Sequence, residues 1–294
     1  MELRTDLAIE ARELQSEEIR DVEYSSEEKS GLLIERLHVK SKRAGQLLKK
    51  EAGRYVTLSL PPLTDNVRDT DKRIEVVASE IRRLLPVNGM VLVVGLGNIN
   101  ITPDALGPKV ASKVLATRHI SEEVARSTGL WRLRAVSVLQ TGVTGQTGIE
   151  TEELILSVVK RIRPTAVIAV DALASRSLRR LGCTLQISDT GIAPGAGVGN
   201  HRVKLSEETL GVPVIAVGIP TVVDAATLVC DLAGGEDESE QQRLCNKVSP
   251  RGSTMVVTPR EIDLLIERAS NLLSLSINMS LHSNISTEDL LSLL

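Results

Sequence analysis

The chain has 294 residues and is 42% hydrophobic, which is enough for a sizeable core. It contains no Phe, two Tyr and one Trp and carries a net charge of −3, so neither base stacking nor a general basic surface is expected to bind nucleic acid. The sequence shows no secretory signal and no apolar run of about 18 residues, so no membrane span is expected. Its three cysteines are widely spaced and predict no disulfide framework.

The N-terminal part of the chain predicts a helix, two strands and a second helix. An amphipathic helix is expected from about Thr5, where Thr5 or Asp6 could cap it. Alternating apolar positions predict strands over 32–40 and 54–60. Apolar residues at helical spacing predict a helix over Asp69–Leu85. These elements form an extra β/α segment ahead of the main sheet.

The middle of the chain alternates strands with helices. The predicted strands are 91–95, 133–138, 166–170, 185–188 and 214–217. The predicted helices are 108–117, 150–161 and one that begins within 220–232. This order predicts an α/β fold with a mostly parallel sheet, right-handed crossovers and helices on its faces. We expect a single domain over residues 1–294.

The C-terminal part of the chain predicts a charged connection and then a helix. The acidic segment 234–243 has few apolar residues and is expected to be solvated or disordered. The following helix is expected to have Thr258 as its N-cap, Pro259 at its first position and Glu261 in a capping box.

Two aspartates lie just beyond apolar runs of the predicted sheet. Asp171 follows the strand 166–170 directly, and Asp104 follows the run 90–98 through a short link. The carboxyl ends of parallel strands form the crevice in which open α/β sheets usually bind ligands. Two carboxylates brought together there could share a proton and activate a water molecule. Aspartates in such positions also cap helices, so spacing alone leaves both interpretations open.

Two glycine-rich loops, 140–148 and 190–200, follow predicted strands. Their backbone N–H groups, including those near Gly145 and Gly197, are candidates for stabilising an oxyanion. A dinucleotide site is not favoured by Gly95–Gly97, because Asn100 stands where the fingerprint needs a third glycine.

Asp189 and His201 are further candidate supporting residues. Asp189 begins the tripeptide Asp-Thr-Gly, which is typical of pepsin-like proteases, but those proteins are β-folds and this chain predicts α/β. Asp189 still follows a predicted strand beside a glycine-rich loop. His201 near two aspartates would suit a divalent metal, although a loop histidine more often bonds to backbone or solvent.

Several long motifs occur in an order that resembles one family. They are TPDALGP, TGIET, VIAVDALASRS, TLGVPVIAVGIPTVVDA and MVVTPREID. They resemble the germination protease family, the endopeptidases of spore-forming bacteria that degrade small acid-soluble spore proteins. The similarity covers most of residues 1–30, 90–231 and 254–285.

The resemblance implies a fold similar to that of hydrogenase-maturation endopeptidases and an atypical aspartic mechanism without a cofactor. The family's essential aspartates match Asp104 and Asp171. The resemblance also implies a homotetrameric zymogen in the cytoplasm of the developing spore, with spore proteins as substrates and no direct contact with nucleic acid or membrane.

The family's substrates are cut after the first Glu of a motif like Thr-Glu-(Phe/Ile)-Ala-Ser-Glu. The segment Thr5–Glu10 has the same layout, so we predict self-cleavage between Asp6 and Leu7 with residues 1–6 as propeptide. A charged, flexible start would make that bond reachable. Family members carry a longer insertion at 232–253, where this chain is short and variable.

The mechanism expected is peptide hydrolysis in which one aspartate is the general base and the other is protonated; the sequence does not assign the two roles. One alternative is a metal-dependent endopeptidase that uses Asp104, Asp171 and His201. Another is a binding module without catalysis, whose glycine-rich loops cradle a ligand.

Overall fold

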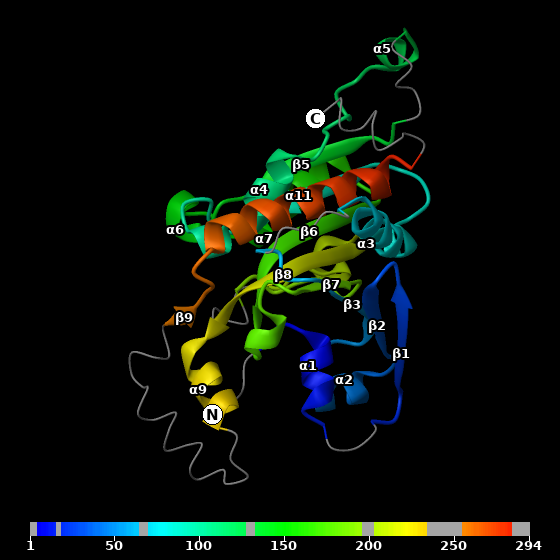
Figure 1. Cartoon of the computed structure of the whole chain (residues 1–294). Coiled ribbons are helices and arrows are strands. Elements are labelled where there is room, and N and C mark those ends of the chain that lie inside the picture. The colour runs from blue at the N-terminus through cyan, green and yellow to red at the C-terminus, as the bar shows by residue number, and fades with distance from the viewer. Residues whose placement is uncertain are drawn as a thin grey trace.

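The protein is built around one large mixed sheet (Figure 1). The computed structural model describes residues 5–15, 19–64, 70–127, 133–195, 203–233 and 255–283. Within these residues the sheet has nine strands, in the order β1-β2-β3-β7-β8-β6-β4-β5, with β9 paired to β8. The strands are β1 (Val22–Lys29), β2 (Leu32–Val39), β3 (Gly53–Ser59), β4 (Val91–Gly95), β5 (Val136–Gln140), β6 (Ala166–Ser175), β7 (Thr184–Ser188), β8 (Val214–Asp224) and β9 (Val256–Val257).

The prediction of an α/β fold is confirmed, but the sheet is mixed rather than mostly parallel. Strands β5, β4, β6 and β8 are parallel, whereas β1, β2, β3, β7 and β9 join antiparallel. The connection from β6 to β7 contains only a short 3-10 turn, η3 (Leu178–Arg180). A link of that length suits an antiparallel return, since parallel strands need a longer crossover.

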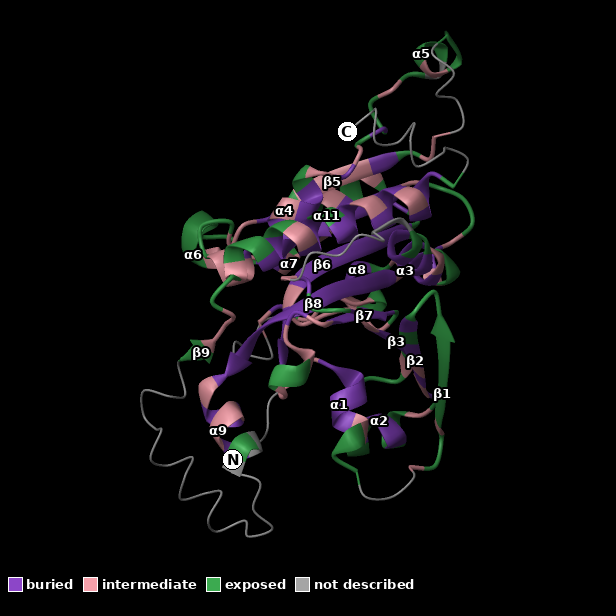
Figure 2. Ribbon diagram, in the orientation of Figure 1, coloured by how far each residue is buried: buried purple, intermediate pink, exposed green. Residues whose placement is uncertain are grey.

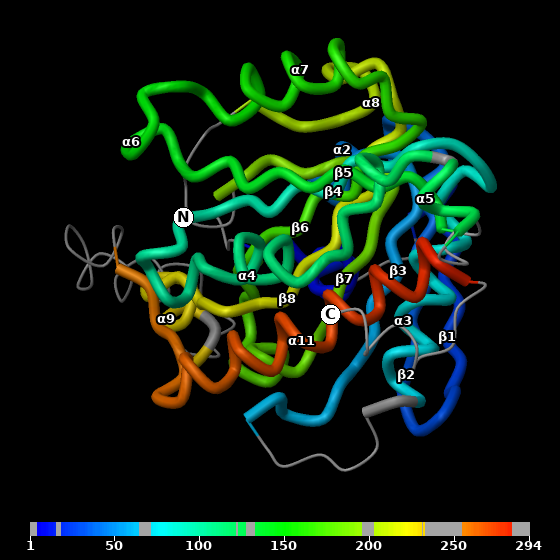
Figure 3. The backbone as a smooth tube through the Cα atoms, turned by 90° about the horizontal axis from the view of Figure 1, so that it is seen from above, coloured from blue at the N-terminus to red at the C-terminus, as the bar shows by residue number. Residues whose placement is uncertain are grey.

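Helices cover both faces of the parallel part, as the view from above shows (Figure 3). Helices α3, α4 and α11 pack on one face, and α7 and α8 pack on the other. The helices are α1 (Ala8–Glu13), α2 (Lys42–Leu48), α3 (Thr70–Leu84), α4 (Leu106–Ser112), α5 (Glu122–Ser127), α6 (Thr144–Thr147), α7 (Thr151–Ile162), α8 (Glu207–Leu210), α9 (Ala225–Ala233) and α11 (Ile262–Leu281). No helix of the described residues is long and apolar enough to cross a membrane.

The core is made of aliphatic side chains that alternate between the two faces of each strand. In β6, Ile168 and Val170 join the cluster under α3 and α11, whereas Val167 and Ala169 join the cluster under α7. Strands β6 and β8 are buried along their length, as Figure 2 shows in purple. Burial on both faces explains their continuous apolar runs.

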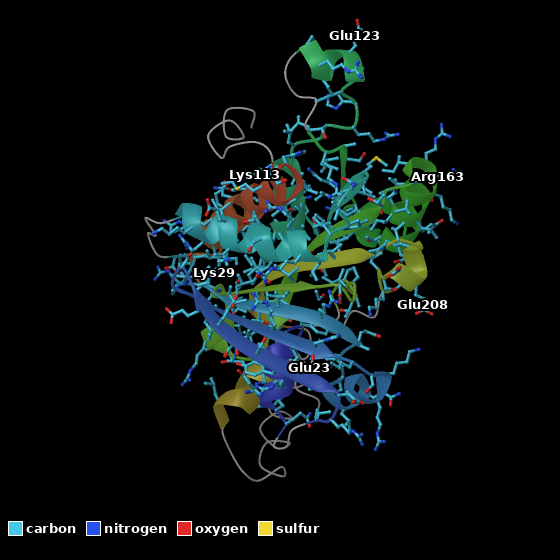
Figure 4. All side chains as sticks on the ribbon, turned by 90° about the vertical axis from the view of Figure 1, so that its right-hand side faces the viewer. Glu23, Lys29, Lys113, Glu123, Arg163 and Glu208 are labelled. Carbon is cyan, nitrogen blue, oxygen red and sulfur yellow. The ribbon has the colours of Figure 1, made fainter. Side chains whose placement is uncertain are left out.

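The edge strand β1 was not predicted from the sequence. Its residues after Val22 are exposed and mostly polar, so no apolar alternation marks it. It is held by a hairpin to β2, in which Ser30 and Gly31 both have positive φ, as a primed turn requires. Charged side chains such as Glu23 and Lys29 point outward from it (Figure 4), which protects the exposed edge from pairing.

Several predicted boundaries were wrong. Strand β6 continues through Ser175, so Asp171 lies inside a strand rather than beyond its end. Strand β8 runs to Asp224, and α9 begins only at Ala225. Helix α1 begins at Ala8 and has no side-chain cap from Thr5 or Asp6.

The predicted cap of the last helix was also wrong. Helix α11 begins at Ile262 after Glu261, with no side-chain cap. The Thr258 hydroxyl instead donates a hydrogen bond to the carbonyl oxygen of Thr221 (2.9 Å), which ties this loop to β8.

The wide spacing of the cysteines predicted no disulfide framework, but Cys230 is disulfide-bonded. The segment 234–243 lies outside the described residues.

Candidate functional site

A cavity of about 550 Å³ lies on the sheet face opposite α3 and α11. Its floor is formed by the adjacent strands β3, β7, β8 and β6, and its wall by α2 and the chain before α1. Figure 1 shows α1 and α2 side by side next to these strands. The cavity combines strand backbone, charged side chains and the N-terminal segment in one place.

One row of residues crosses the cavity floor in register. Asp171 of β6 is the partner of Gly218 in β8, and Gly218 is in turn the partner of Gln186 in β7. Residues in register across a sheet point to the same face. Gly218 has no side chain, and the side chain of Leu173 packs closely over it, on the face that carries Asp171 and Gln186.

Asp171 is a buried carboxyl group on this face, with 4% of its surface exposed. Its Oδ1 accepts a hydrogen bond from the backbone N–H of Ala172 at 2.9 Å. The strand alternation that places Val167 and Ala169 toward α7 gives Asp171 the same orientation. The residue predicted to be catalytic therefore faces the cavity.

Residues Thr5–Glu10 are packed against β6 and β7, with Asp6 lining the cavity. The backbone N–H of Asp6 donates to the carbonyl oxygen of Ala174 (2.9 Å), and the N–H of Ala174 donates to Asp6 Oδ2 (2.8 Å). Leu7 and Ala8 are completely buried. Leu7 packs against Leu173, which is two residues beyond Asp171 on β6. The predicted cleavage bond between Asp6 and Leu7 thus lies beside Leu173 and Ala174, two and three residues beyond Asp171 on β6.

Glu10 anchors the far end of this segment. Its carboxylate is completely buried and accepts hydrogen bonds from the N–H groups of Arg176 (2.7 Å) and Ser177 (3.0 Å). The Thr5 hydroxyl also donates to it. The threonine and both acidic residues of the substrate-like layout therefore make defined contacts.

The cavity wall is rich in lysine. Lys42, Lys49, Lys50 and Lys204 line it, against the carboxyl groups of Asp6, Glu51 and Asp171. Lys50 Nζ donates to the carbonyl oxygen of Thr5 at 2.9 Å. Burial lowers the pKa of Lys50, and the carboxylates of Asp6 and Glu10 oppose that shift. This charge distribution suits an acidic peptide.

Asp104 lies one strand away, in the 3-10 turn η1 (Thr102–Asp104) that follows β4. Its Oδ2 accepts a hydrogen bond from the N–H of Asn98 at 2.7 Å. The turn folds back onto Gly97, where an added Cβ would come within 2.1 Å of the Asp104 carbonyl oxygen. The preceding Leu96 donates to the carbonyl oxygen of Val170 (2.9 Å), next to Asp171. Asp104 is near the same sheet edge but is not among the residues that line the cavity.

The other predicted site residues fall elsewhere. Asp189 is exposed and joins β7 to β3, because its Oδ1 accepts from the N–H of Arg54 (2.7 Å) and its N–H donates to the Arg54 carbonyl (3.2 Å). Gly145 lies exposed in α6, away from the cavity. His201 and Gly197 lie outside the described residues. No group of three His, Cys, Asp or Glu side chains that could hold a metal occurs in the part of the chain that the structure describes.

Sequence reasoning missed Gln186 and Lys50, both of which bond to the docked segment. A glutamine in the middle of the apolar strand Thr184–Ser188 was a readable signal, because a buried amide needs polar partners. Lys50 stands in a basic stretch that gave no sign of burial.

Comparison with known proteins gives consistent similarity over the whole chain. The family model described as "Germination protease" matches residues 2–234 and 231–293. The chain is 42% identical to a germination protease of Caldanaerobacter subterraneus, covering 99% of this chain and 98% of that protein. It is 41% identical to one of Clostridium perfringens (98% and 98% covered) and 36% identical to one of Bacillus licheniformis (98% and 95%).

Among solved structures, a [NiFe] hydrogenase maturation protease from Thermococcus kodakarensis matches with a TM-score of 0.38 and 19% identity, over 69% of this chain and 98% of that one.

Proposed function

The chain belongs to the germination protease family, and we propose that it is an endopeptidase that cuts small acid-soluble spore proteins during germination. It is made as a zymogen that cuts its own chain between Asp6 and Leu7. Residues 1–6 are the propeptide, 1–294 form a single protease domain, and 232–253 are a shortened variable region. The enzyme acts as a homotetramer in the cytoplasm of the developing spore.

The observation that carries this proposal is the docked segment Thr5–Glu10. Its order of threonine, acid, apolar residue, alanine and glutamate matches the substrate layout, and its Asp6 lines the same cavity as Asp171. Asp6 makes two hydrogen bonds to Ala174, one through its backbone N–H and one through its carboxylate, and Ala174 is on the same strand as Asp171. Loss of residues 1–6 would free the partners of Thr5 and Asp6 for a substrate with this layout.

The reaction is hydrolysis by the pair Asp104 and Asp171. One carboxylate takes a proton from water as the water oxygen attacks the carbonyl carbon of Asp6. The other, protonated, gives its proton to the Leu7 nitrogen as the carbon–nitrogen bond breaks. Each such proton transfer contributes roughly 10²–10⁴-fold to the rate. Interacting carboxyl groups titrate as a pair, so the roles of base and acid are assigned to the pair and not to one aspartate each.

Cleavage of a purified small acid-soluble spore protein tests the proposal. Wild-type enzyme should yield discrete fragments cut after an acidic residue. Asp104→Asn and Asp171→Asn should each slow this cleavage by roughly 10²-fold or more, because Asn neither takes nor gives the proton. Asp189→Asn is the matched control and should cleave at the normal rate. Normal turnover by either of the first two variants would exclude the carboxylate pair, and absence of cleavage by wild type would leave only binding.

A further inference from the structure

Gln186 bonds to the docked segment on both sides of the peptide bond between Asp6 and Leu7. Its Nε2 donates to the carbonyl oxygen of Asp6 at 3.0 Å. Its Oε1 accepts from the N–H of Ala8 at 2.7 Å. The side chain is 8% exposed, so these hydrogen bonds are shielded from water.

The Asp6 carbonyl oxygen is the atom on which negative charge develops when water attacks that bond. A fixed N–H donor at such an oxygen stabilises the tetrahedral intermediate, and one donor contributes about 10²–10³-fold to the rate. We propose that Gln186 is a catalytic residue that donates Nε2–H to the scissile carbonyl oxygen and holds the leaving-group side of the chain through Oε1. The inference rests on the proposed cleavage between Asp6 and Leu7.

The sheet fixes where this amide lies. Gln186 and Asp171 flank Gly218 in register, so the amide and the carboxyl group lie on the same face of the sheet. Neighbouring strands are about 4.8 Å apart, so these two residues, on strands either side of β8, are roughly 10 Å apart along the sheet. The amide hydrogen bonds directly to the Asp6 carbonyl oxygen.

The hydrogen bonds from Gln186 and Lys50 are made to backbone atoms of the segment and not to its side chains. Gln186 bonds to the Asp6 carbonyl and the Ala8 N–H, and Lys50 bonds to the Thr5 carbonyl. A separate substrate that follows the same layout would present the equivalents of the Thr5 and Asp6 carbonyl oxygens to Lys50 and Gln186 once residues 1–6 had left. Gln186 neither gains nor loses a proton: water adds across the carbon–nitrogen bond and the amide only stabilises the charge.

The test is self-cleavage of the full chain carrying Gln186→Glu. At neutral pH an ionised Glu has lost the N–H donor and repels the developing charge, so cleavage should slow by about 100-fold or more. As the pH falls, a protonated Glu regains an O–H donor. Its rate relative to wild type should therefore rise, whereas Gln186→Met should stay slow at every pH. Urea unfolding of each variant verifies that it is folded.

The matched control is Gln15→Glu, an exposed residue beyond α1 that is not among the residues lining the cavity, which should cleave like wild type. The inference is overturned if Gln186→Glu cleaves like wild type at neutral pH. It is also overturned if Gln186→Glu, like Gln186→Met, shows no recovery at low pH, because regaining the O–H donor would then not restore cleavage. Failure of wild type to cut between Asp6 and Leu7 contradicts the proposed function instead.

Discussion

At the scale of single residues, the site depends on the absence of a side chain at Gly218. Asp171 and Gln186 flank it in register, and Leu173, against which Leu7 packs, lies over it. A Cβ at Gly218 would come within 2.6 Å of both the Asp171 carbonyl oxygen and Leu173 Cγ. Glycine is therefore required here by close packing rather than by an unusual φ.

Gly218→Ala should lower the free energy of unfolding by about 1–3 kcal/mol, because the added methyl group overpacks the floor. It should also slow self-cleavage, since Leu173 must move and Leu7 packs on it. Urea unfolding and the rate of N-terminal cleavage measure the two effects. Gly145→Ala is the control, because its Cβ meets open space and should change stability by no more than about 1 kcal/mol. A Gly218→Ala variant with unchanged stability and cleavage would show that the close packing at Gly218 is not needed.

At the scale of elements, the buried carboxylate of Glu10 holds α1 to the end of β6. Glu10→Ala leaves the N–H groups of Arg176 and Ser177 without this acceptor. The free energy of unfolding should fall by roughly 2 kcal/mol or more, since an unsatisfied buried donor costs about 1–3 kcal/mol.

The control for Glu10 is Glu13→Ala. Glu13 is 43% exposed and pairs with Arg180, so its loss should cost no more than about 1 kcal/mol. Denaturant unfolding of both variants measures the difference, and equal effects would contradict an anchoring role for Glu10.

The C-terminal end of α11 predicts a pH dependence of stability. His282 is 2% exposed, and burial, followed by the charge of Arg134, lowers its pKa to about 4. The unfolded chain binds a proton at His282 near pH 6.5 but the native chain does not, so stability falls as the pH drops from about 6.5 to about 4.

His282→Leu should remove roughly 3 kcal/mol of this loss, which is the shift from 6.5 to about 4 converted at about 1.4 kcal/mol per pKa unit. Urea unfolding at about pH 7 and at about pH 4.5 measures the loss of stability, because these two pH values span most of the range between the unfolded and the native pKa. His119→Leu serves as the control. The same slope in wild type and His282→Leu would show that His282 is not the source.

At the scale of the whole molecule, the sequence predicted the parts that local patterns determine. The strand Val91–Gly95 is buried on both faces and is a continuous apolar run, and the helix over 70–84 has helical spacing. The polar edge strand β1 carried no such pattern, because its place is set by pairing with β2.

The site could be predicted only in part for the same reason. Apolar runs pointed to Asp171, but its position inside β6 depends on pairing with β8 beyond Val170. Gln186 joins the site only through the register of β7 on β8. The tripeptide Asp-Thr-Gly at Asp189 has the sequence of a protease motif, whereas in the structure Asp189 joins β7 to β3.

The proposed function requires that the segment Thr5–Glu10 is the enzyme's own first substrate. Mass spectrometry of the N-terminus of the purified full-length chain over time detects this cut. Wild type is expected to lose residues 1–6 and begin at Leu7, whereas Asp171→Asn, folded equally well, should keep them. An intact wild-type N-terminus, or the same cut in Asp171→Asn, would contradict it.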